Sequence, residues 1–549
     1  MFKPNPFHTQ TDLFSFVSSL PEAKQKKLKA TKDYAFYEQI FCKINERPFA
    51  VLYSDKKSRP NIPINIIVGA LILKEHRVWS YEELLGQVEF DLRTRIALGL
   101  SDFDQMPFCQ ATLFNFQNRL TAYYLKTGDD LLEQVFDHLT TDQIKTLGLK
   151  TGIQRSDSFL AGSNIRTYSR LQLLVEVLLR LHRILSDADQ ELLAEWFAPY
   201  LKQSSGQYIY QLKSTELKPG LDTLARVYHH LHQKLAPTYG NQAIFKIFDR
   251  VYTEHFTVVA DKIEVKPSEE LTSDSLQSPD DPDATYRHKR DDQSRGQAIH
   301  VTETAHPDNE LNLLTDVAVA TNNTDDSTIL NDRLDRMMEK TPDVEELHTD
   351  GGYGSQDNDR KMEELGITHI QTAIKGQTAA VSLTIEQLDK TSYTVACPFQ
   401  TVQSQPTKTR FKTCFDTIIC TQCPLAEVCS SIKQKQCRTF YFDHDDYLRS
   451  KRHQAIELIP LERRKIRPNV EATVHEFSHR MRNGKVKVRG QAKTRMFAFL
   501  NAIGINFGRI FRYQRAHADP SAQKCKNNLL LACFGLIRSI KRKFHRFES

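Results

Sequence analysis

The chain has 549 residues and 40% hydrophobic residues, which excludes a wholly disordered protein and predicts about three or four domains. It contains no apolar run near the roughly 20 residues that a membrane helix needs, and no apolar signal region follows Met1. We therefore expect an intracellular protein whose ten cysteines are thiols or metal ligands rather than disulfides.

The net charge of +6 is unevenly distributed. Residues 461–549 contain 21 Lys and Arg against five acidic residues, a net charge of +16, which leaves −10 for residues 1–460. Arg-rich segments bind phosphate well, so this end predicts a polyanionic partner such as nucleic acid. A solvated basic surface is the alternative.

Residues 1–130 predict a helical domain. Residues 64–74 are apolar enough for a buried helix, Ser80 and Glu83 form a capping-box pattern, and another helix is expected to begin near Thr112. Short helices with these spacings favour a helix-turn-helix-like bundle that binds DNA. A helical domain without a DNA contact is the alternative.

Helices and strands alternate further along the chain. Residues 150–160 predict a strand, residues 165–236 predict helices with a broad apolar stripe, and the acidic residues 266–283 predict a loop. Two strands are expected at 297–304 and 313–320, followed by a helix from Asp326 to Met338.

The next strand, 345–350, ends at Asp350 before a glycine-rich turn. Ser355 is expected to cap a helix that stops at Gly366, with another strand at 367–374. Near the C-terminus, a helix carries Glu471 and has apolar residues on one face.

This element order predicts an α/β fold: an RNase H-like catalytic core with a helical insertion and a cysteine-rich insertion, preceded by an all-α N-terminal domain. The core is expected at 146–164, 284–375 and 461–515. The other expected regions are a helical N-terminal DNA-binding domain at 1–145, a helical insertion and acidic loop at 165–283, a cysteine-rich insertion at 376–460 and a basic tail at 516–549.

Three acids are the candidate catalytic residues: Asp157 on the first strand, Asp350 at the end of a neighbouring strand and Glu471 on the last helix. Carboxylates gathered in this way bind hard cations, and two Mg²⁺ ions about 4 Å apart can promote an in-line displacement at phosphorus. Taken singly, each acid could equally be an ordinary strand-end, turn or surface residue.

Arg467, Glu471 and His475 are spaced by four residues and share one face of a helix. Arg467 could hold the Glu471 carboxylate, contact a phosphate or form a surface ion pair. Glu476 is the alternative third acid, but it lies about 140° around the helix from Glu471, so both cannot face the metal ions.

Four cysteines form a second pattern, with Cys420 and Cys423 in a Cys-x2-Cys spacing that suits two ligands of a tetrahedral zinc ion. Cys397, Cys420, Cys423 and Cys429 are the expected zinc ligands, and Cys414 and Cys437 could substitute. Unligated thiols are the alternative. The remaining cysteines are expected to be buried small apolar residues: Cys42, Cys109, Cys525 and Cys533.

Several segments resemble, in order, those of bacterial insertion-sequence DDE transposases with an InsH-type N-terminal domain. Residues 52–63, 98–100 and 112–120 resemble that domain. Residues 155–164 resemble the first-aspartate motif, 278–289 and 349–355 the second-aspartate region, and 470–477, 488–490 and 501–506 the third-acid region. The likeness covers roughly residues 20–515.

The resemblance implies cleavage and strand transfer on the terminal inverted repeats of a mobile element, in the bacterial cytoplasm at the nucleoid. It implies that Mg²⁺ activates first water and then a 3′-hydroxyl, that Arg467, His475 and Arg489 contact DNA, and that a homodimer or larger assembly forms on DNA. Relatives often have a Tyr where this chain has Arg464 and a basic residue where it has Ser478, which affects only the assignment of phosphate contacts.

Two rival functions fit parts of the same pattern. A metal-dependent nuclease would keep the three acids but release cleaved ends without joining them. A non-enzymatic, zinc-stabilised DNA-binding protein, such as a decayed transposase, would still bind DNA after Asp350→Ala.

Overall fold

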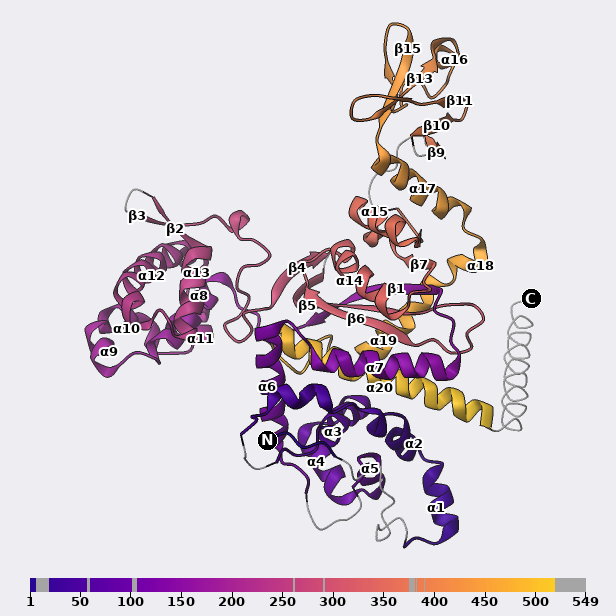
Figure 1. The fold of residues 1–549 in the computed structure, drawn as a ribbon. Helices are drawn as coiled ribbons and strands as arrows, with labels where there is room; N and C mark the ends of the chain where they lie inside the picture. The colour runs from indigo at the N-terminus through magenta and orange to yellow at the C-terminus, as the bar shows by residue number, and fades with distance from the viewer. Residues whose placement is uncertain are drawn as a thin grey trace, which may run out of the picture. The chain divides into compact units, whose positions relative to one another are not determined.

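The computed structural model describes residues 1–5, 19–56, 60–100, 106–259, 262–289, 292–374, 381, 383–389 and 391–518 (Figure 1). The chain folds into two compact units. Unit 1 comprises Met1–Thr151, Glu303–Thr315 and Phe499–Ser549, and unit 2 comprises Gly152–Thr302 and Asp316–Ala498. Both units are therefore assembled from segments that are distant in the sequence.

Helices form the N-terminal part of unit 1, as the sequence predicts. They are α1 (Glu22–Lys29), α2 (Lys32–Gln39), α3 (Ile64–Arg77), α4 (Tyr81–Phe90), α5 (Leu92–Ala97), α6 (Gln110–Thr127) and α7 (Leu131–Leu147), with the short helices η2 (Phe41–Lys43) and η3 (Arg47–Leu52). The apolar helix α3 is buried over most of its length.

Helix ends in unit 1 follow from local sequence. The capping box that begins α4 is confirmed: Ser80 accepts the backbone N–H of Glu83, whose carboxylate accepts the N–H of Ser80. Asp130 caps α7, which ends at Gly148 in the left-handed conformation. These caps satisfy backbone groups that the first and last turns leave unpaired.

The expectation of buried apolar cysteines is wrong for the two that the structure describes. Cys109 is exposed and Cys42 is partly exposed. Cys109 is the N-cap residue of α6 and its thiol lies 3.4 Å from the Thr112 hydroxyl, so it occupies a solvent-facing helix end rather than a core position. Cys525 and Cys533 lie outside the described residues.

A six-stranded sheet brings distant segments together. Its order is β4-β5-β1-β7-β8, and β6 also pairs with β5. Strands β1, β7 and β8 run parallel, whereas β4 and β5 form an antiparallel pair. The strands are β1 (Ile153–Gly162), β4 (Thr285–Lys289), β5 (Asp292–Thr304), β6 (Leu314–Thr321), β7 (Glu346–Thr349) and β8 (Thr368–Gln371).

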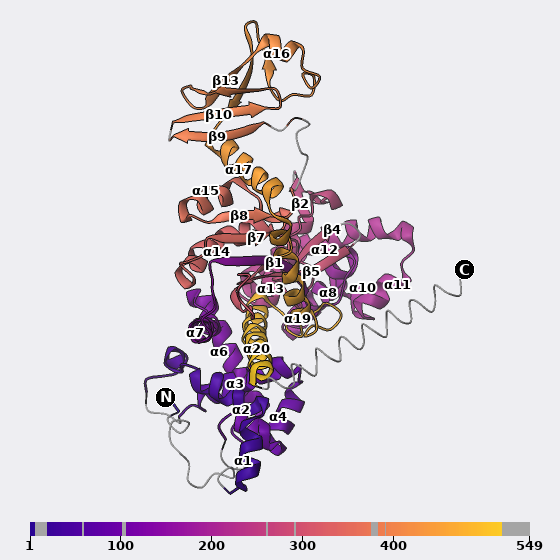
Figure 2. The same ribbon diagram turned by 90° about the vertical axis from the view of Figure 1, so that its right-hand side faces the viewer.

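Helices α14 (Asp326–Lys340) and α15 (Gln356–Leu365) lie beside β7 and β8 (Figures 1 and 2). Their apolar faces share a core with Leu347 of β7 and with Tyr353. The predicted limits of α15 are confirmed, since Ser355 caps its first turn and Gly366 ends it in the left-handed conformation. The helix bearing Glu471 is α19 (Val470–Ser478), preceded by α18 (Leu461–Arg464) and η7 (Arg467–Asn469).

A helical region follows β1 and has an apolar core of its own, which includes Leu174, Tyr228 and Phe248. It consists of α8 (Arg170–His182), α9 (Asp187–Leu192), α10 (Ala194–Leu201), α11 (Ser205–Gln211), η4 (Ser214–Glu216), α12 (Leu217–Tyr239) and α13 (Ala243–His255), then the hairpin of β2 (Phe256–Val259) and β3 (Lys262–Val265), and η5 (Ser268–Glu270).

The region that carries most of the cysteines contains two small antiparallel sheets, β11-β10-β9 and β12-β13-β15-β14. Its elements are β9 (Thr384–Asp389), β10 (Ser392–Cys397), β11 (Gln400–Gln403), β12 (Gln405–Pro406), β13 (Phe411–Asp416), α16 (Thr417–Thr421), β14 (Ile432–Lys433), β15 (Cys437–Phe442) and α17 (His444–Leu458). An aromatic core built around Tyr393, Phe415 and Phe442 supports them.

The last described element is α20 (Gln491–Ala518), a helix of 28 residues. Asn506 on this helix hydrogen-bonds both backbone groups of Leu314, at 2.9 and 3.0 Å, and donates to the Thr140 hydroxyl at 3.3 Å. These contacts join the three segments of unit 1. In the part of the chain that the structure describes, no helix has the length and apolar character needed to cross a membrane.

Candidate functional site

The three predicted acids are brought together from three elements. Asp157 lies within β1, Asp350 follows the last residue of β7, and Glu471 is the second residue of α19. Strands β1 and β7 pair in parallel with Arg155 opposite His348, so Asp157 and Asp350, each two residues further on, occupy corresponding positions. We call Asp157, Asp350 and Glu471 the acid triad.

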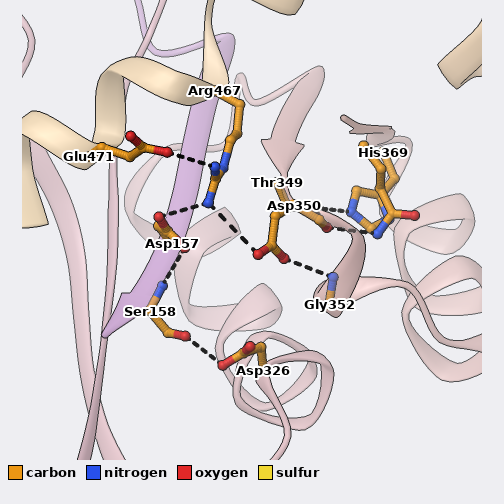
Figure 3. A network of polar contacts seen from close by, with 10 residues as sticks. Asp157, Ser158, Asp326, Thr349, Asp350, Gly352, His369, Arg467 and Glu471 are labelled. Carbon is orange, nitrogen blue, oxygen red and sulfur yellow. Dashed lines mark hydrogen bonds and ion pairs between the residues drawn. The ribbon is translucent and has the colours of Figure 1, made fainter. Parts of the chain in front are cut away.

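A single guanidinium lies among the acid triad (Figure 3). Nη2 of Arg467 is 2.9 Å from Oδ2 of Asp157 and 3.7 Å from Oδ2 of Asp350, while Nη1 is 3.2 Å from Oε1 of Glu471. Because one nitrogen reaches both aspartates, their Oδ2 atoms are no further apart than the sum of those two distances. The geometry therefore already accommodates one cationic group shared by three carboxylates.

Contacts with β1 fix the segment that carries Arg467 and Glu471. The buried Arg155 of β1 donates from Nη1 to the backbone carbonyl of Ile466, at 2.9 Å. The rings of Phe159 on β1 and Phe477 on α19 lie 5.4 Å apart. Arg155 and Phe159 thus hold this segment to the strand that bears Asp157.

The glycine-rich turn after β7 holds Asp350. The backbone N–H of Gly352 donates to Oδ1 of Asp350 at 2.8 Å, and the Gln371 amide of β8 donates to the Asp350 carbonyl at 3.0 Å. A Cβ at Gly354 would lie 2.8 Å from Nη1 of Arg452 and 2.9 Å from Oε1 of Gln371, so a larger residue would displace the ends of these two side chains. The turn therefore fixes both the backbone and the carboxylate of Asp350.

Burial sets the electrostatics of the site. The pKa of Asp157 is raised, chiefly because burial penalises its charged form and also because Asp350 is near, although Arg467 and the N–H of Ser158 act in the opposite direction. Only 8% of Asp157 is exposed, whereas Glu471 is exposed. The cost of burying a charge is therefore greater at Asp157 than at Glu471, and a bound cation would offset it.

Three further residues at this site escaped the sequence analysis. The Ser158 hydroxyl donates to Oδ1 of Asp326, the first residue of α14, and the buried Tyr353 is part of the turn that follows Asp350. The sequence gives one weak indication for Asp326, because this acid begins the helix that follows strands β5 and β6. Acidic residues are common in the first turn of a helix, so this signal does not separate a site residue from a capping residue.

The predicted DNA contacts are not gathered in one place. Arg467 points into the acid triad and its side chain is only 15% exposed. His475 is exposed, with Nε2 at 2.8 Å from Nε2 of His479. Arg489 donates to the Asn164 carbonyl at 2.8 Å and lies 3.6 Å from Asp280.

The four predicted zinc ligands, Cys397, Cys420, Cys423 and Cys429, line one pocket whose walls also include Phe415 and Arg438. The pKa of Cys420 is raised mainly by burial, with smaller contributions from the other three thiols. The alternative ligands Cys414 and Cys437 are outside this lining, and each thiol shifts the pKa of the other. Over the described ranges, no group of three or more His, Cys, Asp or Glu is arranged to hold a metal ion.

Comparison with known families assigns the chain to a class. Residues 392–511 match the family described as Transposase DDE domain, and this matched range includes Glu471. Residues 24–119, in the helical N-terminal part, match the family described as Transposase domain (DUF772). No curated protein and no solved structure matches the chain. The two family matches support a DNA-processing enzyme of the transposase class. Both matches are to transposase domains, and together they support an insertion-sequence DDE transposase.

Proposed function

We propose that this protein binds the terminal inverted repeats of an insertion sequence and catalyses Mg²⁺-dependent DNA cleavage and strand transfer. The observation that carries the proposal is the sharing of one guanidinium by Asp157, Asp350 and Glu471. Three carboxylates that converge on one cation form a set of oxygen donors suited to a hard divalent metal.

The strand order around these acids supports an RNase H-like core. Asp157 lies on β1, which is flanked by β5 and β7, and Asp350 follows β7 directly. Glu471 comes from α19, which packs on β1 through Phe477. We assign the helical region after β1 and the cysteine-rich region before α18 as insertions into this core.

Asp157, Asp350 and Glu471 would hold the metal ions of the reaction. Bound Mg²⁺ would polarise the scissile phosphodiester and lower the pKa of an attacking water or 3′-hydroxyl. The chain itself keeps the carboxylates in place: the N–H of Gly352 holds Oδ1 of Asp350, and the N–H of Ser158 holds Oδ1 of Asp157 at 2.9 Å. In each aspartate, Oδ2 is the oxygen that faces the guanidinium of Arg467.

Arg467 would exchange partners when metal and DNA bind. Its guanidinium is shared by the three carboxylates, and a phosphate of the DNA backbone is an equally suitable bidentate partner. We assign His475 and Arg489 to further DNA contacts, with the helical N-terminal part and the basic C-terminal segment as the main binding surfaces. Because two transposon ends must be joined, the active form is a dimer or a larger assembly on DNA.

A cleavage and joining assay on a labelled transposon end, with and without Mg²⁺, tests the proposal. Asp157→Asn, Asp350→Asn and Glu471→Gln should each abolish both reactions. Glu476→Gln is the matched control, because it changes a glutamate on the same helix and should retain activity. An inactive Glu476→Gln with an active Glu471→Gln would make Glu476 the third acid.

The products of the same assay separate the rival functions. Free cleaved ends without joined products would identify a nuclease. Specific DNA binding without any Mg²⁺-dependent cleavage by the intact protein would identify a non-enzymatic DNA-binding protein. Joined products that disappear in all three triad variants support the transposase assignment.

We also propose a structural zinc ion bound by Cys397, Cys420, Cys423 and Cys429, because the four thiols line the same pocket. Four thiolates form a closed tetrahedral site, and ordering of the ligands on binding would stabilise this small region. Metal analysis of the purified protein should find about one zinc per chain. Cys423→Ser should lose the zinc and Cys109→Ser should retain it, whereas a zinc-free wild type would refute the site.

A further inference from the structure

Asp326 is an acidic residue next to the acid triad to which the proposed function gives no role. It is the first residue of α14, and Oδ1 of its carboxylate accepts the Ser158 hydroxyl (Figure 3). Ser158 follows Asp157 on β1 and also donates its backbone N–H to Oδ1 of Asp157. One serine therefore links the Asp326 carboxylate to that of Asp157.

The absent side chain of Gly352 leaves a space between Asp326 and Asp350. A Cβ at Gly352 would lie 3.0 Å from Oδ1 of Asp350 and 3.3 Å from Oδ2 of Asp326. Gly352 does not have the positive φ that would require glycine for conformational reasons. A larger residue at position 352 would therefore fill the space between Oδ1 of Asp350 and Oδ2 of Asp326.

The two oxygens of Asp350 face different partners. Oδ2 is the atom near Arg467, whereas Oδ1 borders the space shared with Asp326. Among the residues that the structure describes, no Lys or Arg forms an ion pair with Asp326. The guanidinium therefore lies on the triad side of Asp350, whereas the Asp326 side has hydrogen bonds from Gly352 and Ser158 but no ion pair with a described Lys or Arg.

A buried polar group also points to this region. The Oη atom of Tyr353 is inaccessible to solvent and has no hydrogen-bond partner of good geometry within the described ranges. Burial raises its pKa well above the usual value, and Asp326, Asp157 and Asp350 add to the shift, whereas a hydrogen bond with Ser158 acts in the opposite direction. The cluster therefore contains a buried phenol beside three carboxylates, with Ser158 as its neighbouring hydroxyl.

We propose that Asp326 is a fourth carboxylate of the metal centre and holds a divalent cation together with Asp350 in the space left by Gly352. This inference rests on the proposed function, because it extends the same centre. In that arrangement Asp350 serves cations on both sides, and Ser158 keeps the Asp326 carboxylate aligned. Asp326 thereby supplies a further negative charge to the metal centre, on the side of Asp350 that faces away from Arg467.

Binding of Mn²⁺ to the full-length, DNA-free protein tests the proposal without measuring activity. Electron paramagnetic resonance of free Mn²⁺ gives the affinity and the number of ions bound. Asp326→Asn keeps an acceptor for the Ser158 hydroxyl but removes the charge, so it should weaken at least one site about tenfold or more. Gly352→Ala should do the same by filling the space.

Asp325→Asn is the matched control. Asp325 precedes Asp326, is exposed, and makes no side-chain capping hydrogen bond, so its loss should leave Mn²⁺ affinity unchanged. Thermal unfolding without metal verifies that each variant folds. Asp326→Glu retains the negative charge, so this variant should bind Mn²⁺ more tightly than Asp326→Asn does.

The outcomes distinguish this inference from the proposed function. If Asp326→Asn and Gly352→Ala bind Mn²⁺ as the wild type does while Asp350→Asn does not, the role of Asp326 is refuted and the acid triad stands. If the wild type binds no Mn²⁺, or Asp157→Asn and Asp350→Asn bind as the wild type does, both proposals fail. Weakened binding in Asp326→Asn with unchanged Asp325→Asn supports the fourth carboxylate.

Discussion

Arg467 donates from Nη2 to Oδ2 of Asp157 across 2.9 Å, although 310 residues separate them in the chain. Both side chains are largely buried, at 15% and 12% exposure. A guanidinium therefore lies directly beside the buried carboxylate of Asp157. Since it also reaches Asp350 and Glu471, it compensates charges that would otherwise repel one another.

Arg467→Gln should destabilise the metal-free protein, because it leaves Asp157 buried without a charged partner. Loss of one member of a buried pair costs about 3 kcal/mol. Mg²⁺ should restore more stability to Arg467→Gln than to the wild type, because cation binding replaces the lost compensation. Urea unfolding with and without Mg²⁺ measures both effects. Arg464→Gln, an exposed neighbour, is the control, and equal stability of both variants would contradict the prediction.

Arg155→Gln should reduce DNA cleavage without removing any acid. The lost hydrogen bond to the Ile466 carbonyl loosens the segment that carries Arg467 and Glu471. A weakening of about 1.4 kcal/mol in the transition state corresponds to a tenfold lower rate. Cleavage rates at saturating Mg²⁺ and faster hydrogen exchange in residues 466–478 test this. Arg463→Gln, which loses only a more exposed ion pair with Glu346, should change the rate little.

Gly296→Ala should strongly destabilise unit 2. The φ of Gly296 is +154°, and a Cβ there would lie 2.3 Å from the Ala161 carbonyl oxygen and 2.6 Å from the Ser163 nitrogen. Neither backbone atom can move without disrupting the pairing of β5 with β1, so the cost should be about 3 kcal/mol. Gly220→Ala on α12 would meet only ordinary contacts and is the control. Thermal unfolding compares the two; equal melting temperatures would refute the clash.

Acid should unfold the protein partly through His300. Burial lowers the pKa of His300 from 6.5 to about 4, so the folded state binds fewer protons than the unfolded state in this range. The contribution of His300 to the free energy of unfolding is therefore fully present above pH 6.5. It is lost as the pH falls from 6.5 to 4, and the loss amounts to about 3 kcal/mol. His300→Phe should flatten the profile between these pH values. Urea unfolding from pH 7 to 4 measures it, with the exposed His288→Gln as control.

Local patterns in the sequence predict the setting of Asp350 well. Ser355 and Gly366 mark the ends of α15, and the glycine-rich turn precedes it, so a strand, turn and helix could be placed without tertiary information. The spacing of four between Arg467 and Glu471 likewise predicts their contact, which the structure has at 3.2 Å.

Tertiary relationships could not be predicted in this way. The contact between Arg467 and Asp157 depends on how α19 packs against β1, and the sequence gives no sign that the guanidinium turns inward. Asp326 looks like an ordinary acid at the start of a helix. Its place beside Asp350 becomes visible only when the position of Gly352 is known. Cys109 was misjudged because cysteine is usually buried, whereas here it begins a helix.

The hydrogen bonds of Asn506 have a consequence for synthesis on the ribosome. Unit 1 contains the first segment of the chain, yet Asn506 joins it to Leu314 and Thr140 from more than 190 residues further on. A nascent chain cannot form these contacts until Asn506 has been translated. Products that terminate before Asn506 therefore lack a finished unit 1, although they contain the whole of its N-terminal helical segment.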